Sequence, residues 1–205
     1  MEKAKLIGIN RLRMFSDGHG ITTLVGFHGC PLRCKYCLNP QCFRNEVLIE
    51  KTAEEIMKDL RKDELYFIAT KGGVTFGGGE PLLHAEFIRD VLELGAKQWN
   101  VTIETSLNIP IEKLELLLPY VNEYIVDIKD MNPAIYQSYT GKDNTFVISN
   151  LRWLVKQGKA KNIICKIPFI PSYNDNTDRK RSAEKLKELG IERSHFFDYC
   201  TTIKK

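Results

Sequence analysis

Three cysteines near the N-terminus could bind a metal centre. Cys30, Cys34 and Cys37 follow one another with the spacing C-x3-C-x2-C. A structural zinc ion takes four ligands in a closed tetrahedral shell, and an iron–sulfur cluster that only transfers electrons is usually held by four thiolates. Three closely spaced thiols therefore favour a cluster in which one iron stays open to a substrate or cofactor. A zinc knuckle or a redox C-x2-C pair is the alternative that the spacing leaves open.

The aromatic residue inside the cysteine motif makes the pattern more specific. Tyr36 precedes Cys37, and C-x3-C-x-aromatic-C resembles the signature of the radical S-adenosylmethionine (SAM) superfamily. The resemblance implies that Cys30, Cys34 and Cys37 hold a 4Fe-4S cluster whose fourth iron chelates the amino and carboxylate groups of SAM. It also assigns Tyr36 to the cofactor site. Electron transfer from the cluster would then cleave SAM to methionine and a 5′-deoxyadenosyl radical.

A glycine-rich turn supplies a second motif. The run Gly77-Gly78-Gly79-Glu80-Pro81 follows a predicted strand but lacks the lysine and the hydroxyl residue that complete a phosphate-binding loop. Glycine is needed where backbone must approach a ligand closely. Gly-Gly-Glu-Pro resembles the superfamily motif that contacts the cofactor's amino group, which assigns Gly78, Gly79 and Glu80 to SAM binding. A plain glycine-rich turn is the alternative.

Two acidic strand ends resemble those of the glycyl radical enzyme activating enzymes. Asp127-Ile128-Lys129 resembles their Asp-Leu-Lys motif, which implies that Asp127 and Lys129 lie close to the cofactor, with Lys129 among the catalytic residues. Glu104 and Thr105 stand where that family has Asp-Thr, and the resemblance implies a monovalent cation bound by Glu104, Thr105 and Asp127. Carboxylate and hydroxyl oxygens suit a hard cation. Surface ion pairs are the alternative for both motifs.

Further matches extend the resemblance over nearly the whole chain. Asp17 opens the run Asp-Gly-His-Gly-Ile, which is similar to the family's Asp-Gly-Pro-Gly-Ile, and we expect Asp17 to contact the partner peptide. Lys166 stands where an arginine is common, and we expect it to face the cofactor carboxylate. The departures from the family pattern are His19, Thr22 and Cys200. They affect the expected substrate recognition more than cofactor binding.

The elements that would position these residues alternate along the chain. Strands are predicted at residues 21–27, 73–76, 100–105, 124–128, 162–167 and 195–199, after an extended segment at 5–15. Helices are predicted at residues 52–62, 84–97, 111–118, 145–157 and 178–189. Apolar strands that alternate with helices indicate parallel βα units, and six strands are too few for a closed eightfold barrel.

Periodicity alone does not separate an open sheet from a partial barrel. The family resemblance implies an α/β fold, a (β/α)6 partial TIM barrel with mostly parallel strands. Cys30, Glu80, Glu104, Asp127 and Lys129 would then lie at or just past the C-terminal ends of strands, where such folds place their chemistry.

Composition limits the class of protein. The chain has 205 residues, of which 43% are hydrophobic, and no linker divides it, so we expect a single domain at 1–205. The N-terminal residues lack the apolar core of a secretory signal and no run is long enough to span a membrane, which indicates a cytoplasmic protein. The net charge of +4 is modest, and the most basic stretch is interleaved with glutamates, so no nucleic-acid partner is expected. Cys42 and Cys165 are expected to be reduced bystanders.

Together these features predict a radical SAM oxidoreductase similar to pyruvate formate-lyase activating enzyme. Its radical would abstract hydrogen from a backbone glycine of a partner glycyl radical enzyme under anaerobic conditions. A glycine suits this step because flanking amides stabilise its Cα radical and the missing side chain lets the loop enter a narrow barrel. We expect a monomer that is reduced by a flavodoxin- or ferredoxin-like donor.

Three alternatives stay open at this point. The first is a radical SAM enzyme that acts on a small molecule, of the deazaguanine-forming type. The second is an activase of anaerobic ribonucleotide reductase. The Asp127-Ile128-Lys129 motif favours the glycyl radical activase over both. The third alternative is a non-enzymatic metal-binding module.

Overall fold

The structure, a computed structural model, describes residues 2–14, 17–45 and 48–198. The chain folds as two compact units. The first unit comprises Met1–Cys30, Asn39–Thr105 and Ile109–Ile125, and the second comprises Pro31–Leu38, Ser106–Asn108 and Val126–Lys205. Cys30 therefore belongs to the first unit, whereas Cys34 and Cys37 belong to the second. The predicted single domain stays a prediction, because a division into compact units does not test whether the chain folds as one body.

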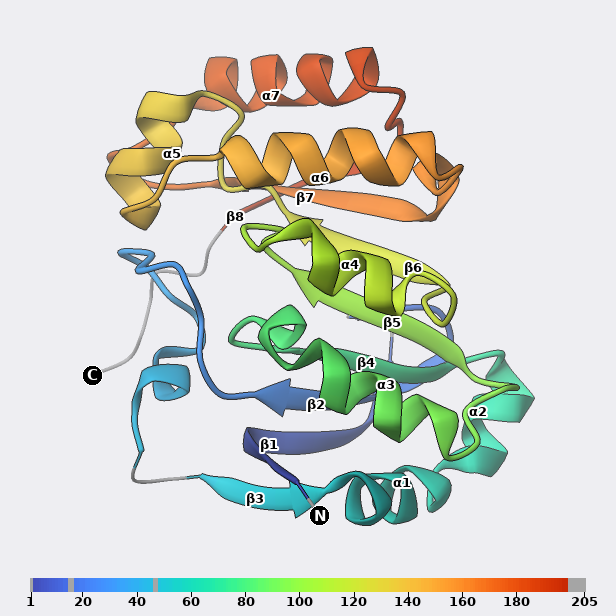
Figure 1. Cartoon of the computed structure of the whole chain (residues 1–205). Helices are drawn as coiled ribbons and strands as arrows, with labels where there is room; N and C mark the ends of the chain where they lie inside the picture. Colours follow the sequence, from blue (N-terminus) through green and yellow to red (C-terminus); the bar gives the residue numbers. More distant parts are fainter. Residues whose placement is uncertain (1, 15–16, 46–47, 199–205) are drawn as a thin grey trace. The chain divides into compact units, whose positions relative to one another are not determined.

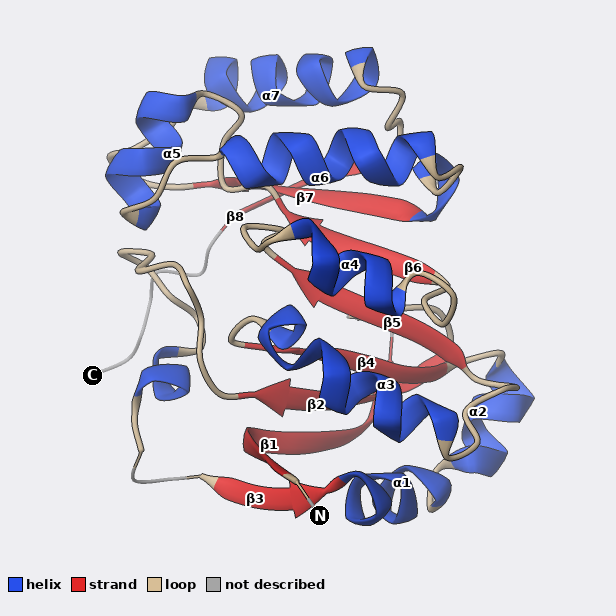
Figure 2. Ribbon diagram, viewed as in Figure 1, coloured by secondary structure: helices blue, strands red, loops and turns tan. Residues whose placement is uncertain are grey.

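The first unit is built on a run of paired strands. They are β1 (Lys3–Met14), β2 (Ile21–Phe27), β3 (Ile49–Thr52), β4 (Gly73–Gly78) and β5 (Asn100–Thr105). Its helices are α1 (Ala53–Arg61), α2 (Glu64–Thr70), α3 (Ala85–Glu93) and α4 (Ile111–Leu117), with short 3-10 helices η1 (Pro40–Phe43) and η2 (Pro81–His84). Strand β1 is antiparallel to β2 and β3, whereas β2 with β4 and β4 with β5 are parallel. Figure 2 shows these strands in red and the helices in blue.

The core of this unit lies along the parallel strands. Val25, Phe27, Val74, Phe76 and Ile103 have no exposed surface. These strands are rich in β-branched residues, which favour strands, and buried threonines lie among the apolar side chains, namely Thr23, Thr75 and Thr102.

Helix α1 begins where the sequence predicts. The Thr52 hydroxyl accepts a hydrogen bond from the Glu55 N–H at 3.3 Å, and the Glu55 carboxylate accepts one from the Thr52 N–H at 2.8 Å. This reciprocal pair is a capping box, which satisfies backbone donors that the first turn of a helix leaves without partners.

The second unit carries the remaining elements. Strand β6 (Glu123–Asp127) crosses into it from the first unit, and it adds α5 (Pro133–Thr140), α6 (Thr145–Lys156), η3 (Ala160–Asn162), β7 (Ile163–Phe169), α7 (Asn176–Glu188) and β8 (Ser194–Asp198). Strands β7 and β8 are parallel. Figure 1 shows α6 and α7 on the same side of β7.

The strands form one sheet in the order β3-β1-β2-β4-β5-β6-β7-β8. The predicted α/β class with mostly parallel strands is confirmed, and the unclosed order agrees with a partial barrel. All six predicted strands are present as β2 and β4 to β8, and the extended segment is β1. Strand β3 was not predicted, nor were α2 and α5, and the sheet that the described residues form has eight strands. Tyr199, at the end of the last predicted strand, and Cys200 lie outside the described residues.

The helices are short. The longest that the structure describes, α7, has 13 residues, and in the described ranges no helix is both long and apolar enough to cross a lipid bilayer.

Candidate active site

The glycine-rich turn lies at the C-terminal end of β4. Gly78 has φ +97°, in the region that favours glycine, and a Cβ on Gly79 would lie 2.0 Å from the Gly29 carbonyl oxygen. The Gly79 N–H donates to the Phe27 carbonyl at 2.9 Å and the Glu80 N–H to the Gly29 carbonyl at 2.8 Å. The turn is therefore fixed against the residue that precedes Cys30, in a packing that side chains would prevent.

Glu80 is a buried carboxylate at the start of η2. It is 0% exposed, and it accepts hydrogen bonds from the Leu82 N–H at 3.3 Å and the Thr105 hydroxyl at 2.6 Å. Thr105 is the last residue of β5. Because a buried charge requires donors around it, Thr105 helps to keep Glu80 in place, and the structure brings these two predicted site residues together.

The segment with Cys34 and Cys37 is tied by its backbone to helix α5. The Arg33 N–H donates to the Thr140 carbonyl at 2.8 Å, and the Lys35 N–H donates to the Tyr139 carbonyl at 3.2 Å. These carbonyls belong to the last turn of α5, where helical acceptors need outside donors. The cysteine loop thus has a rigid attachment in the second unit.

Aromatic rings surround Tyr36. Its ring centroid lies 6.2 Å from that of Tyr139 and 6.1 Å from that of Tyr173, and these two rings are 5.2 Å apart. Such offset or edge-to-face contacts are favourable. Tyr139 and Ile170 also form a buried cluster against which Cys34 packs, so Tyr36 and Cys34 share one apolar environment.

Cys30, Cys34 and Cys37 form no disulfide bonds. Burial raises the pKa of Cys34 to about 11, an effect that the positive charge of Lys129 opposes and the negative charge of Asp127 strengthens. Lys129 and Asp127 form an ion pair. Lys129 also has φ +57°, an uncommon backbone conformation for a residue with a side chain.

Lys166 and Asp17 have defined neighbours. Lys166 lies on β7, and its carbonyl accepts the Ile128 N–H at 3.0 Å, next to Lys129. Asp17 is buried and pairs with Arg13 at 2.6 Å. These contacts do not test the expected roles of Lys166 toward the cofactor and Asp17 toward a partner peptide, which stay predictions.

The donor set fits an iron–sulfur cluster, because clusters are held by cysteine thiolates. Within the described ranges, no three His, Cys, Asp or Glu side chains are grouped as a single metal ion would require.

The expected cation ligands fall in different units: Glu104 and Thr105 in the first, Asp127 in the second. The Thr105 hydroxyl donates a hydrogen bond to Glu80, and Asp127 forms an ion pair with Lys129.

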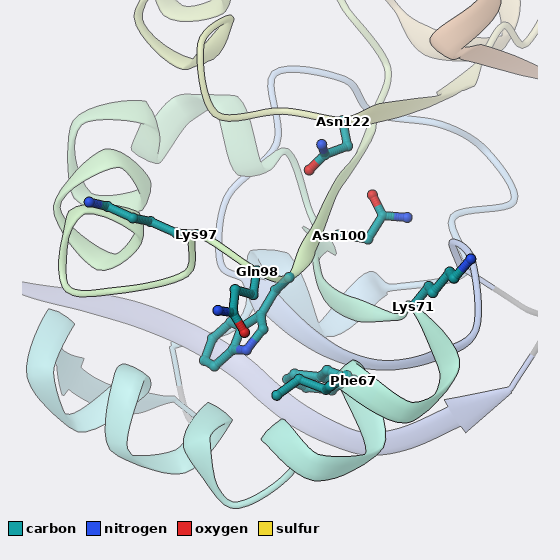
Figure 3. Close-up of a pocket in the computed structure, with 8 residues that line it drawn as sticks. Phe67, Lys71, Lys97, Gln98, Asn100 and Asn122 are labelled. Atoms are coloured by element: carbon teal, nitrogen blue, oxygen red, sulfur yellow. The ribbon is translucent and has the colours of Figure 1, made fainter.

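A separate surface groove lies at the other end of β5. It has a volume of about 460 Å³ and is lined by Phe67, Ile68, Lys71, Lys97, Gln98, Trp99, Asn100 and Asn122. Figure 3 shows Lys71 and Lys97 extending away from each other on opposite sides of it. Asn100 begins β5 and Thr105 ends it, so the groove contains none of the predicted site residues.

Sequence reasoning missed the supporting residues of the second unit. Tyr139 and Tyr173, which contact Tyr36, were not singled out. A signal for α5 was present, because Asn132 accepts the Ala134 N–H at 3.0 Å as its cap and Pro133 is its first residue. Recognising that start would have predicted the helix that carries Tyr139.

Comparisons with known proteins identify the family. A family model described as "Radical SAM superfamily" matches residues 24–203. The (2S)-3-sulfopropanediol dehydratase activating enzyme of Klebsiella oxytoca is 30% identical over 85% of this chain and 74% of its own length. The pyruvate formate-lyase-activating enzyme of Clostridium pasteurianum is 40% identical over 62% of this chain and 53% of its own length.

Among solved structures, Streptococcus suis SuiB bound to S-adenosylmethionine superposes with a TM-score of 0.67 over 88% of this chain. The chain spans 43% of that protein at 17% identity, so this likeness supports the fold alone. The family match covers most of the chain and includes all three cysteines of the motif. The chain belongs to the radical SAM superfamily and, within it, to the glycyl radical enzyme activating enzymes, which use a 4Fe-4S cluster and S-adenosylmethionine.

Proposed function

We propose that this chain installs a radical on a backbone glycine of a partner glycyl radical enzyme. The observation that carries the proposal is the C-x3-C-x2-C motif, whose three cysteines form no disulfide, inside a chain that matches activating enzymes over most of its length. Cys30, Cys34 and Cys37 hold the cluster. When bound and reduced, the cluster supplies the electron that splits SAM into methionine and a 5′-deoxyadenosyl radical.

The remaining residues bind and orient the cofactor. Gly78 and Gly79 form a turn that packs against the Gly29 backbone, where a side chain on Gly79 has no room. In this proposal the turn lies at the methionine end of SAM, and Glu80 offers its carboxylate to the cofactor's amino group. Tyr36 packs beside the cofactor within its aromatic cluster.

Two lysines and three oxygen-bearing side chains complete the proposed set of ligands. Lys129, held by Asp127, and Lys166 offer positive charge to the cofactor carboxylate. Glu104 and Thr105, with Asp127, are proposed ligands of a monovalent cation. These oxygen donors have the chemistry that such an ion prefers.

The partner's glycine loop is the substrate. Hydrogen passes from the glycine Cα to the 5′-deoxyadenosyl radical, which gives 5′-deoxyadenosine and leaves the unpaired electron on the glycine. Asp17, buried beside Arg13, is the proposed contact to the partner peptide. We further propose a cytoplasmic monomer that receives its electron from a flavodoxin- or ferredoxin-like protein.

The test begins with anaerobic reconstitution of the purified protein with iron and sulfide. After chemical reduction in the presence of SAM, wild-type protein should form 5′-deoxyadenosine and methionine. Cys34→Ala should abolish both products. Cys42→Ala is the matched control, because it removes a buried thiol outside the motif and should leave product formation intact.

The activase step is tested separately. Incubation with a glycyl radical enzyme encoded near this chain's gene should give the doublet electron paramagnetic resonance signal of a glycyl radical. SAM cleavage without a radical in any candidate partner would refute the activase assignment, and retained cleavage in Cys34→Ala would refute the cluster assignment.

A further inference from the structure

A buried acid that the proposed chemistry does not use lies directly after Lys129. Asp130 is 2% exposed. Its Oδ1 accepts hydrogen bonds from the Asn132 N–H at 2.8 Å and the Ser182 hydroxyl at 3.2 Å, and its Oδ2 accepts one from the Asn174 side-chain amide at 3.3 Å. Asp130 thereby joins three parts of the second unit: the turn after β6, the loop after β7, and helix α7.

Asn174 and Ser182 extend this network to backbone groups. Asn174 Oδ1 accepts the Ile170 N–H at 2.7 Å, and its Nδ2 also donates to the Pro168 carbonyl at 3.1 Å. The Ser182 hydroxyl oxygen accepts the Met131 N–H at 3.0 Å. Each side chain therefore uses both its donor and its acceptor capacity, as fully connected buried networks require.

The segments joined by this network carry the proposed cofactor contacts of the second unit. Lys129 holds φ +57°, a conformation that persists only when surrounding contacts impose it. In the loop after β7, Ile170 packs with Tyr139, and the Tyr173 ring contacts the Tyr36 ring. Lys166 lies in the strand that leads into this loop.

We infer that Asp130 is a positioning residue for SAM: through Ser182 and Asn174 it fixes the Lys129 turn and the loop that carries Tyr173 in the arrangement that binds the cofactor. This inference rests on the proposed function of Lys129 and Tyr36. It assigns a role to three polar side chains outside the motifs that bind the cluster and cofactor.

The chemistry of the network specifies a carboxylate at this position. Burial raises the pKa of Asp130, and the bonds from Asn132, Asn174 and Ser182 oppose that rise. All three partners donate to Asp130. An asparagine in its place keeps one acceptor oxygen but turns an NH2 group toward another donor, because an amide has a single oxygen. Asp130→Asn should therefore break the link to Asn174 while it retains the turn at Asn132.

The experiment uses the full-length chain and has two readouts. Hydrogen exchange of the cluster-free protein should show lost protection in Asp130→Asn at residues 129–132 and 170–174. In the reconstituted protein, the KM for SAM should rise about tenfold while kcat changes less than about twofold, because a misplaced ligand weakens cofactor binding. Ser182→Ala is a milder variant, which is expected to raise the KM for SAM about threefold. It replaces Asp130→Asn in the test if that variant folds poorly.

Two further variants make the result specific. Asp143→Asn is the matched control: Asp143 also accepts an N–H two residues ahead, from Thr145 at 2.9 Å, but it is exposed, and the KM should not change. Asp130→Asn combined with Asn174→Asp reverses donor and acceptor across the Asp130–Asn174 bond. This double variant should recover part of the KM change. Recovery is incomplete because the carboxylate introduced at position 174 faces the Pro168 carbonyl, to which the Asn174 amide donated a hydrogen bond.

The outcomes separate this inference from the proposed function. An unchanged KM in Asp130→Asn, whatever happens to hydrogen exchange, would show a structural role alone and overturn the inference. A raised KM that the double variant does not reduce would overturn the proposed link to Asn174. If wild-type protein never cleaves SAM, the proposed function fails first, and the inference falls with it.

Discussion

The hydrogen bond from Thr105 to Glu80 offers a direct test of the site in the first unit. Thr105→Val removes the hydroxyl and keeps the shape of the side chain. The bond is 2.6 Å long, and both residues are buried, at 3% and 0% exposure. A hydrogen bond to a charged group contributes about 1.5 to 3 kcal/mol, so the variant should lose about 2 kcal/mol of unfolding free energy. For a chain of this size that corresponds to a fall of about 4 to 8 °C in Tm.

A second variant at the same position determines the cause of the change. Thr105→Ser keeps the hydroxyl and loses one buried methyl group, at a cost of about 0.8 kcal/mol. If the hydroxyl matters, Thr105→Val is the less stable of the two. If packing matters, the order is reversed, because valine keeps both branches. Thermal and urea unfolding of the cluster-free protein measure the order without any cofactor.

Should Thr105→Val prove as stable as wild type, or Thr105→Ser the less stable variant, the bond does not hold Glu80. In the reconstituted enzyme, Thr105→Val should also raise the KM for SAM, since Glu80 would lose a contact that orients it. If Thr105→Val is as stable as wild type and its KM for SAM is unchanged, Thr105 does not orient Glu80 for SAM binding.

Three other predictions concern reactivity, electron transfer and folding. With a pKa of about 11, Cys34 should have about one thiolate in a thousand at pH 8. Its alkylation in cluster-free protein should therefore be slow and should accelerate as the pH rises toward 11. Lys129→Met should slow alkylation further and Asp127→Asn should speed it. If mass spectrometry finds that Cys34 is alkylated as fast as an ordinary thiol, the raised pKa of Cys34 is contradicted. Arg33 and Lys35 are exposed on the cysteine loop, so Arg33→Glu with Lys35→Glu should slow reduction by an acidic flavodoxin about tenfold at low salt. Dithionite reduction should stay unchanged, and an equal loss with both reductants would point to a damaged site. Thr52→Ala should cost about 1 kcal/mol of unfolding free energy by removing the α1 cap, and Thr52→Ser should restore most of it; equal stability of the alanine variant would show that the capping box adds nothing.

The parts of the fold that the sequence predicts well are those with local, continuous patterns. Strands β2 and β5 have the predicted bounds because their apolar, β-branched runs are buried. Helix α2 was missed for a physical reason. Leu65, Tyr66 and Ile68 are 81%, 49% and 51% exposed, and Phe67 is its only residue in the buried class. Its apolar residues therefore do not form the buried stripe on which helix prediction depends.

Strand β3 was missed because its stability depends on distant residues. It has four residues, and its backbone pairs with Lys3 to Leu6 of β1. The residues Ile49, Glu50 and Lys51 are exposed or half-buried, so no apolar alternation marks the segment as a strand. Pairing across such a separation leaves no periodic signal in the segment itself.

The candidate site also contains both kinds of residue: those in local sequence motifs, which can be predicted, and those that meet only in the folded chain, which cannot. Cysteine spacing and the glycine-rich turn are local motifs. The close approach of Gly79 to the Gly29 carbonyl explains why a glycine is required there, whereas the assignment of the turn to SAM binding stays a prediction. The Asp130 network joins residues 44 and 52 positions apart. Nothing in the immediate sequence of Asp130, Asn174 or Ser182 predicts that they meet, because their contact depends on the packing of β6, β7 and α7.

The Thr105 contact also bears on the predicted cation site. A threonine hydroxyl has one proton to donate and two lone pairs with which to accept. In the structure its proton is directed to Glu80, and a hydroxyl that donates its proton keeps lone-pair density for a cation. The bond to Glu80 is therefore compatible with cation binding by the same oxygen. The two Thr105 variants that test the orientation of Glu80 therefore also test this cation ligand. Thr105→Val lacks the hydroxyl oxygen that would bind the cation, whereas Thr105→Ser retains it.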